Sequence, residues 1–248
     1  MLPIVKNKYF SKSITNPNKY VEKYKNYKYF KFPKRCIITY PYIKKIVEEI
    51  IKELKFDFIK YSNFFVIKDF FSVFISSTSS PNVACLIEEL RTLGVNEIIN
   101  TGIAAGISDK LNSGDIILVK GAFRDEGTSY HYIKPSKISY PSKDFYNKIK
   151  SILLKSTIDF KTGYVWTTDA PYRETDIEIN YFKNKGTLCV DMESSAVFCV
   201  CNYYGIKSSS VLVISDIIYN GKWNCEFDKN KFNESFRKIF NSFLKYDI

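Results

Sequence analysis

Short apolar runs alternate with longer amphipathic segments along the chain after residue 34. The runs are rich in β-branched and aromatic residues, which is typical of buried strands, and the amphipathic segments have the apolar spacing of helices. Pro41 and Pro81 are placed to begin helices, and Gly94 and Gly205 to end them. The predicted strands are 35–40, 64–67, 70–75, 97–101, 115–120, 164–168, 187–190 and 209–215, and the predicted helices follow Pro41 and Pro81 and occupy 142–156, 174–185, 196–204 and 228–243.

This alternation predicts an α/β fold with a central, largely parallel sheet. Strands 64–67 and 70–75 are expected to form a β-hairpin. Because residues 1–34 are polar, basic and interrupted by prolines, we expect them to form a basic N-terminal arm, followed by a single domain over 35–248. Ligands bind such sheets at the carboxyl ends of strands, where the chain has segments 102–106, 168–173, 191–194 and 215–216.

The composition narrows the class of protein. Apolar residues make up 45% of the 248 residues, which excludes a disordered chain. No apolar run approaches the roughly 18 residues of a membrane-spanning helix, and the N-terminus lacks the pattern of a secretory signal. The six cysteines form no CxxC pair, and His131 is the only histidine. We therefore expect reduced thiols, no metal site and a cytoplasmic protein.

The net charge of +11 raises the question of nucleic-acid binding. The lysines are scattered over the whole chain rather than gathered in a stripe, which indicates a general compositional bias. The densest cluster, 19–34, interleaves lysines with tyrosines that could stack on bases, but a solvated arm is the simpler interpretation. We expect no nucleic-acid and no membrane partner, and a general attraction for anionic substrates such as phosphate.

The most informative segment is 190–196, between a predicted strand and a predicted helix. Asp191 and Glu193 lie where free N–H groups and the helix dipole favour an ionised carboxylate. An ionised Glu193 can accept two hydrogen bonds, for example from neighbouring ribose hydroxyls. Taken alone, the segment favours a simpler interpretation in which both residues cap a helix. Residues 102–106 are mostly small and are expected to form a loop that lets a ligand approach the backbone, without the Gly-Lys-Ser/Thr ending of a P-loop.

Four short segments carry a family resemblance, and they follow one another along the chain in the family's order: Thr101–Gly106, Ser113–Ile117, Val190–Ala196 and Ser215–Asp216. With them the chain resembles the nucleoside phosphorylase superfamily, which includes purine nucleoside phosphorylase, uridine phosphorylase and methylthioadenosine nucleosidase. The resemblance covers about residues 35 to 245, and its most specific parts are the Met-Glu and Ser-Asp pairs. It implies a three-layer α/β/α fold around a mixed, largely parallel twisted sheet.

The resemblance also implies roles for individual residues. Glu193 would bind the ribose hydroxyls, Met192 would pack against the sugar, and Asp216 would be the acid that protonates or hydrogen-bonds N7 of a purine leaving group. The base would be bound by Thr168, Asp169, Pro171, Tyr172, Arg173, Asp191 and Ser215. Phosphate would lie near Thr101, Gly102, Ile103, Arg124 and His131, and His131 is equally well explained as a loop residue.

The chain departs from the family where phosphate is usually bound. The family's Gly-Asp-Pro-x-x-Arg motif corresponds to 39–44, which lacks both the aspartate and the arginine, and its usual arginine and Ser/Thr near the small-residue segment correspond to Asn100 and Ile103. Phosphate needs donors and positive charge. Residues Arg35, Lys44, Arg124 and Arg173 could each supply a substitute cation, and the sequence does not choose among them.

The expected function is phosphorolysis: nucleoside and inorganic phosphate give free base and ribose 1-phosphate, with no metal and no cofactor besides the phosphate co-substrate. Asp216 favours a purine, and a uridine phosphorylase is an alternative. Asn100 and Ile103 keep open a nucleosidase that uses water, and a nucleoside-binding protein without turnover. The resemblance implies a homo-oligomer, either a dimer or a hexamer, with hairpin 64–75 and the arm as candidate contacts.

Overall fold

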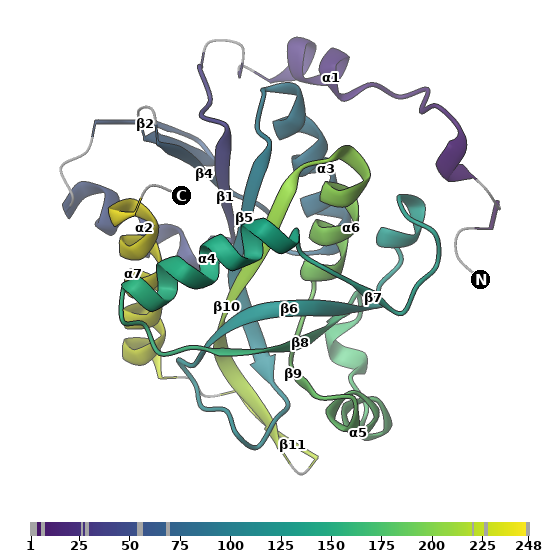
Figure 1. The fold of residues 1–248 in the computed structure, drawn as a ribbon, viewed down its shortest axis with the longest axis vertical. Coiled ribbons are helices and arrows are strands. Elements are labelled where there is room, and N and C mark those ends of the chain that lie inside the picture. Colours follow the sequence, from purple (N-terminus) through teal and green to yellow (C-terminus); the bar gives the residue numbers. More distant parts are fainter. Residues whose placement is uncertain are drawn as a thin grey trace.

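A single sheet runs through the molecule, with helices packed against it (Figure 1). The computed structural model describes residues 4–5, 8–25, 27, 30–53, 57–67, 70–219, 221–225 and 228–246. The strands are β1 (Arg35–Thr39), β2 (Phe58–Tyr61), β3 (Phe64–Ile67), β4 (Phe71–Ile75), β5 (Glu97–Gly106), β6 (Ile116–Asp125), β7 (Ile138–Ser139), β8 (Lys161–Thr168), β9 (Thr187–Asp191), β10 (Lys207–Tyr219) and β11 (Lys222–Asn224). The helices are α1 (Pro17–Tyr24), α2 (Lys44–Glu53), α3 (Ser80–Thr92), α4 (Lys143–Lys155), α5 (Asp176–Asn184), α6 (Ser194–Tyr204) and α7 (Lys229–Lys245), with short 3-10 helices η1 (Lys8–Phe10), η3 (Pro41–Ile43), η4 (Ser129–His131) and η5 (Pro171–Arg173).

The sheet is mixed and contains two parallel blocks. β4, β1, β5 and β10 form one block, and β6, β8 and β9 form the other. Antiparallel pairings of β10 with β6 and of β5 with β9 join them. Because β5 also pairs with β10, strands β5, β10, β6, β8 and β9 close into a ring. The predicted mixed α/β sheet and the β3–β4 hairpin are confirmed, while the ring adds a closure that the strand pattern does not encode.

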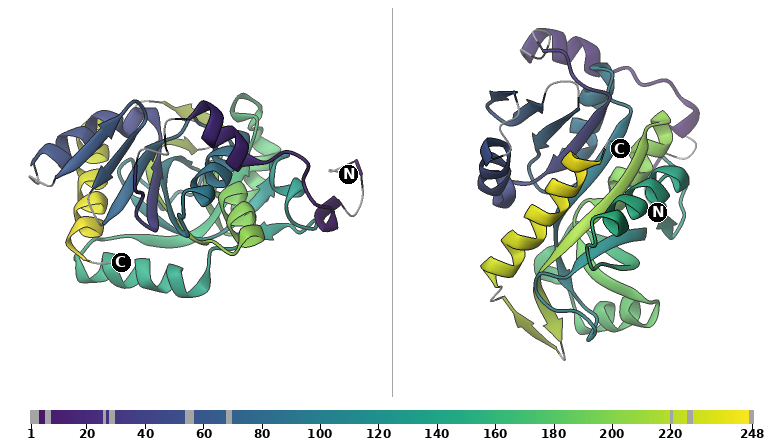
Figure 2. Two further views of the ribbon diagram at one scale, coloured as in Figure 1. Left: turned by 90° about the horizontal axis from the view of Figure 1, so that it is seen from above. Right: turned by 60° about the vertical axis from the view of Figure 1, so that its left-hand side comes forward.

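Neighbouring residues of the central strands point to opposite faces of the sheet, as the pleat requires. Ile38, Ile98 and Leu212 belong to the core under α3 and α6. Their neighbours Ile37, Ile99 and Val211 belong to a second core under α2, α4 and α7. The right-hand view of Figure 2 shows α7 running along β10. Two apolar faces covered by two sets of helices make the three layers that the sequence predicts.

The helix boundaries follow local signals. Pro81 lies in the first turn of α3, and Gly205 ends α6 in the left-handed conformation with φ 69°. α5 begins two residues later than predicted, because Thr175 and Glu178 form a capping box that sets its first turn. These signals place the helices correctly because they act within a few residues.

Three segments predicted as loops, or as lying beyond the end of a strand, are strands. Residues 102–106 continue β5, because they pair with β10 and, at their end, with β9. Gly102 is needed for packing rather than for a turn: a Cβ there would lie 2.8 Å from Cε2 of Tyr40. β10 does not stop at Ser215 but runs on to Tyr219 through a register shift between Ile214 and Ile217, and β6 likewise runs on through Arg124.

The described part of the predicted N-terminal arm contacts the core. It includes α1, which runs beside α3 at the top of Figure 1. Val21 and Tyr27 are buried, and Lys25 Nζ lies 3.6 Å from the Glu89 carboxylate. Residues 1–3, 6–7, 26 and 28–29 of the arm lie outside the described residues, and the domain boundary at residue 34 stays a prediction. No helix in the described part of the chain is long and apolar enough to cross a membrane.

Candidate functional site

A cavity of about 670 Å³ opens at the carboxyl ends of β5, β9 and the neighbouring part of β10. The predicted site residues that line it are Ile103, Pro171, Tyr172, Asp191, Met192, Glu193, Ser215 and Asp216. It is also lined by residues that the sequence did not single out, among them Tyr42, Glu174, Asp176 and Trp223. The fold therefore brings most of the predicted sugar- and base-side residues into one cavity.

Asp191 caps helix α6, as the simpler interpretation of the sequence proposed. Its Oδ2 accepts a hydrogen bond from the Ser194 N–H at 3.0 Å, and its Oδ1 accepts one from the Thr167 hydroxyl at 2.7 Å. The residue is 4% exposed, and burial raises the pKa of Asp191. Since both oxygens are engaged by the protein, Asp191 holds the strand–helix junction in place.

Glu193 occupies the N-cap position of α6 but makes no side-chain capping bond. Its Oε1 accepts a hydrogen bond from the Ser79 N–H at 2.7 Å, and its Oε2 accepts one from the Met192 N–H at 3.3 Å. Ser79 has φ 112°, a conformation that is unfavourable for a residue with a Cβ by about 1–3 kcal/mol. The strained conformation points the Ser79 N–H group at the carboxylate. The resulting hydrogen bond holds Glu193 at the cavity wall.

Burial and the neighbouring charge of Asp191 raise the pKa of Glu193 to about 8. We therefore expect E193Q to be more stable than the wild type, by a margin that grows as the pH rises from 4.5, the ordinary pKa, to about 8. In this window the unfolded wild type loses its proton while the folded protein keeps it, so rising pH favours unfolding; glutamine has no proton to lose.

Thermal denaturation of both proteins near pH 5 and near pH 8 measures this effect. A gain in Tm near pH 8 of about 4 °C would correspond to roughly 1–2 kcal/mol for a domain of this size. An equal difference at the two pH values would contradict a raised pKa of Glu193 as its cause.

Asp216 lies at the register shift in β10, which turns its carboxylate toward the cavity. Its Oδ2 accepts a hydrogen bond from the Trp223 indole N–H at 2.7 Å, and its Oδ1 accepts one from the Ser215 hydroxyl. Trp223 belongs to β11, which pairs with the end of β10. No pattern in the sequence pointed to Trp223, because the short strand that carries it is stabilised by this pairing with a distant segment.

Glu174 follows Pro171 and Tyr172 at the end of η5 and lines the cavity beside Asp216. Burial, the Asp216 charge and the Glu178 charge together raise the pKa of Glu174 to about 7. This residue was missed in the sequence, because its environment is made by β10 and α5 rather than by its own neighbours.

A buried network without charge occupies the side of β5 where the sequence departs from the family that it resembles. The Tyr40 hydroxyl donates to Asn100 Oδ1 at 2.6 Å, and Asn100 Nδ2 donates to Ser210 Oγ at 3.2 Å. The Tyr40 ring packs on Gly102, and the Thr101 hydroxyl, also buried, has no hydrogen-bond partner among the described residues. Only Ile103 of the predicted phosphate-side residues lines the cavity.

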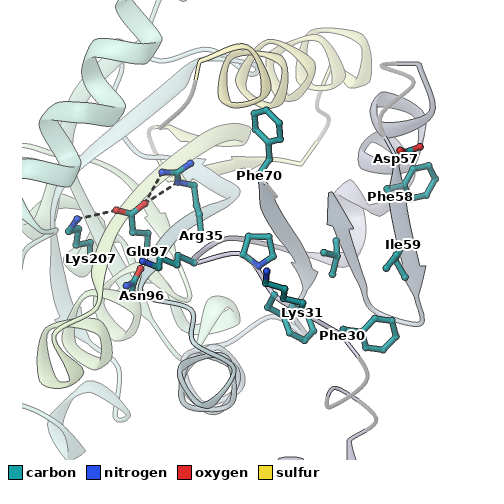
Figure 3. Close-up of a pocket in the computed structure, with 14 residues that line it drawn as sticks. Phe30, Lys31, Arg35, Asp57, Phe58, Ile59, Phe70, Asn96, Glu97 and Lys207 are labelled. Carbon is teal, nitrogen blue, oxygen red and sulfur yellow. Dashed lines mark hydrogen bonds and ion pairs between the residues drawn. The ribbon is translucent and has the colours of Figure 1, made fainter. Parts of the chain in front are cut away.

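The basic residues that could replace the family's phosphate-binding arginines lie outside this cavity. Among the described residues, none of the cavity-lining side chains is a lysine or an arginine. Arg35 pairs with Glu97 at 2.8 Å and Lys207 pairs with the same carboxylate at 3.1 Å, in a separate hollow of about 1040 Å³ at the amino ends of the strands (Figure 3). Lys44 Nζ donates to the Ser62 carbonyl at 3.3 Å, and Arg173 is exposed on η5.

Arg124 and Asp169 line another hollow, of about 710 Å³. Asp169 Oδ2 accepts a hydrogen bond from the Gly127 N–H at 2.8 Å, while Thr168 lies at the buried end of β8 and accepts from the Ala170 N–H at 3.2 Å. His131 is exposed, with Nδ1 at 2.8 Å from Lys8 Nζ. The structure therefore does not bring these predicted residues to the wall of the Glu193 cavity.

No group of three or more His, Cys, Asp or Glu residues in the described part of the chain could hold a metal ion. All six cysteines are free, and four of them, Cys36, Cys189, Cys199 and Cys201, are buried.

Comparison with known proteins shows which family the chain matches. A family model described as the phosphorylase superfamily matches residues 40–245. Two curated relatives are a guanosine phosphorylase of Halorubrum lacusprofundi, 23% identical over 57% of this chain, and a DeoD-type purine nucleoside phosphorylase of Bacillus cereus, 28% identical over 62% of it. The matched stretches span 58% and 67% of these relatives.

Two solved structures have a fold similar to that of this chain. Purine nucleoside phosphorylase from Toxoplasma gondii superimposes with a TM-score of 0.72 over 87% of this chain and 94% of its own, at 21% identity. Uridine phosphorylase from Vibrio fischeri superimposes with a TM-score of 0.66 over 86% of this chain and 87% of its own, at 26% identity. The three-layer fold predicted from the sequence resemblance is thereby confirmed.

Proposed function

Because this chain belongs to the phosphorylase superfamily, we propose that it cleaves the N-glycosidic bond of purine ribonucleosides with phosphate, giving free base and ribose 1-phosphate. The observation that carries the proposal is the shared cavity, which has Met192 and Glu193 on one wall and Asp216 on another. No cofactor besides the phosphate co-substrate is needed. The reduced state of the cysteines is consistent with a cytoplasmic enzyme.

The cavity suits the charges that develop during this reaction. Breaking the bond leaves positive charge on the ribose and negative charge on the base. Acidic side chains dominate the polar lining, and their field stabilises a positively charged sugar. Two ribose hydroxyls would donate to the free lone pairs of Glu193, and these bonds favour its ionised form despite its raised pKa. Pro171 and Tyr172 would form the wall against the base.

The described lining of the cavity contains no lysine or arginine, and this favours a second candidate function, hydrolysis of the nucleoside by water. The neutral Tyr40–Asn100 pair takes the place where the family has an arginine, and none of the cavity-lining residues that the structure describes is basic. Phosphorolysis would then need a cation from a second copy of the chain, which fits the predicted dimer or hexamer. Both candidates use the same sugar and base walls and differ only in the nucleophile.

One assay separates them. The protein is incubated with inosine, guanosine, adenosine and uridine, with and without phosphate, and the sugar product is identified. Ribose 1-phosphate that forms only with phosphate is the expected result. Free ribose formed at the same rate without phosphate would replace phosphorolysis by hydrolysis, faster turnover of uridine than of the purines would overturn the purine assignment, and binding without any product would refute enzymatic activity.

A further inference from the structure

Another buried carboxyl group lies beside the first turn of α6, outside the Glu193 cavity. Glu126 directly follows β6 and is 4% exposed. Its Oε1 accepts a hydrogen bond from the Ser195 hydroxyl at 2.7 Å, and its Oε2 accepts one from the Ser129 N–H at 2.9 Å. An apolar pair of the same shape could occupy this place at little cost in stability. Stability alone therefore does not explain why the chain has a carboxyl group here.

The contact with Glu126 holds the helix turn that begins at Glu193. Ser195 is the second residue of α6, and Glu193 is the N-cap of the same helix. The Ser195 N–H donates to the Thr167 hydroxyl at 3.1 Å, which in turn donates to Asp191 Oδ1 at 2.7 Å. The first turn of α6 is thus held by side chains that follow β6, end β8 and end β9.

Helix α3 holds the same junction through other contacts. Besides the Ser79 N–H, which donates to Glu193, the Ser80 hydroxyl donates to the Met192 carbonyl at 2.7 Å. Glu126 and Ser195 themselves do not line the Glu193 cavity. They are therefore placed to influence a bound nucleoside only through the residues of the junction.

We infer that Glu126 is a positioning residue of the proposed reaction. Through the Ser195 hydroxyl it fixes the first turn of α6, and with it the Glu193 carboxylate that would bind the ribose. This inference rests on the proposed function and adds to it a residue outside the cavity. A hydrogen-bonded network of this kind holds a side chain in one arrangement, which apolar packing alone specifies less strictly.

The inference also gives a role to the polar segment after β6. Arg124 Nε donates to the Ser129 hydroxyl at 2.9 Å, while the Ser129 N–H donates to Glu126. Ser129 begins the short helix η4 and is completely buried. Arg124 thus holds the turn that supplies one donor to Glu126, and Glu126 connects this turn to α6.

The test measures kcat/KM of E126Q and S195A with inosine and with 2′-deoxyinosine. The single side-chain oxygen of glutamine takes the place of two acceptors, and S195A removes the hydroxyl donor. We expect both variants to lose about 10-fold with inosine, because a small displacement of a positioned group is costly. The loss with 2′-deoxyinosine should be only about 3-fold, because this substrate would make one contact fewer with Glu193.

The double variant E126Q/E193Q shows whether Glu126 acts through Glu193. If it does, the double variant should be no slower with inosine than E193Q alone, since effects that pass through one residue are not additive. E88Q is the matched control: Glu88 Oε1 accepts from the Tyr132 hydroxyl at 2.5 Å, away from the first turn of α6, so E88Q should keep the wild-type rates. Losses that multiply in the double variant would contradict the inference.

Amide hydrogen exchange provides a measurement that does not depend on turnover. The Val197 N–H donates to the Glu193 carbonyl at 2.9 Å in the first turn of α6. In E126Q and S195A this amide should exchange about 10-fold faster than in the wild type, and in E88Q at the wild-type rate. Unchanged exchange in both E126Q and S195A would refute the proposed effect of Glu126 on α6.

The outcomes separate this inference from the proposed function. Turnover by the wild type, with the same rates in E126Q and S195A, would overturn the role of Glu126 and leave the proposed function standing. An equal loss for inosine and 2′-deoxyinosine would show that Glu126 only stabilises the fold. Absence of base release by the wild type from every nucleoside would refute the proposed function, and this inference with it.

Discussion

Glutamine in place of Glu193 is expected to lower kcat/KM for purine ribonucleosides by about 100-fold or more. A hydrogen bond to a charged group contributes about 1.5–3 kcal/mol, and a carboxylate fixed by the Ser79 and Met192 N–H groups would accept one from each ribose hydroxyl. Glutamine keeps one acceptor for the backbone but loses the charge that also stabilises the cationic sugar. Initial rates with inosine measure the loss.

The same variant assayed with 2′-deoxyinosine provides the control. A deoxynucleoside makes one hydroxyl contact fewer, so wild-type and E193Q rates should differ less with it than with inosine. Equal losses for the two substrates would contradict contact between Glu193 and the 2′-hydroxyl. Circular dichroism is expected to show an unchanged fold, because the change removes charge rather than volume at a site that is 6% exposed.

Local patterns in the sequence were enough to predict much of this molecule. Strands such as 35–39 and helices such as α4 follow from apolar periodicity, which depends only on nearby residues. The junction at Asp191 and Glu193 was found because a strand end, a helix start and two acids coincide in one short segment. The distinction between the two acids required the structure, since one of the two donors to Glu193 is Ser79, which is distant in sequence.

The features that sequence did not predict all depend on distant partners. Residues 102–106 have the small side chains of a loop, and they are a strand because β9 and β10 pair with them. The raised pKa of Glu174 likewise comes from burial in the folded protein and from the charges of Asp216 on β10 and Glu178 on α5. Arg124 is the reverse case. Its charge suggested a phosphate ligand, but the residue is buried and its guanidinium donates hydrogen bonds to the protein itself.

The R124M variant is expected to lose about 3 kcal/mol of stability, which for this size of domain lowers Tm by roughly 6–12 °C. The Arg124 guanidinium donates to the Ser129 hydroxyl at 2.9 Å, the Ser136 hydroxyl at 2.8 Å, and the carbonyls of Ile133 and Lys134 at 3.3 and 2.9 Å. Methionine fills similar space but leaves these four acceptors, among them the buried Ser129 hydroxyl, without this donor. Thermal or urea denaturation measures the loss.

Arg173 offers the matched control, since it is an exposed arginine of η5 and was an equal candidate for binding phosphate. R173M should keep the wild-type Tm. Below its own melting temperature, R124M should retain the wild-type KM for phosphate, because its guanidinium is committed to the segment 129–136 and lies outside the Glu193 cavity. An R124M protein with unchanged Tm and a strongly raised KM for phosphate would restore Arg124 as the missing phosphate ligand.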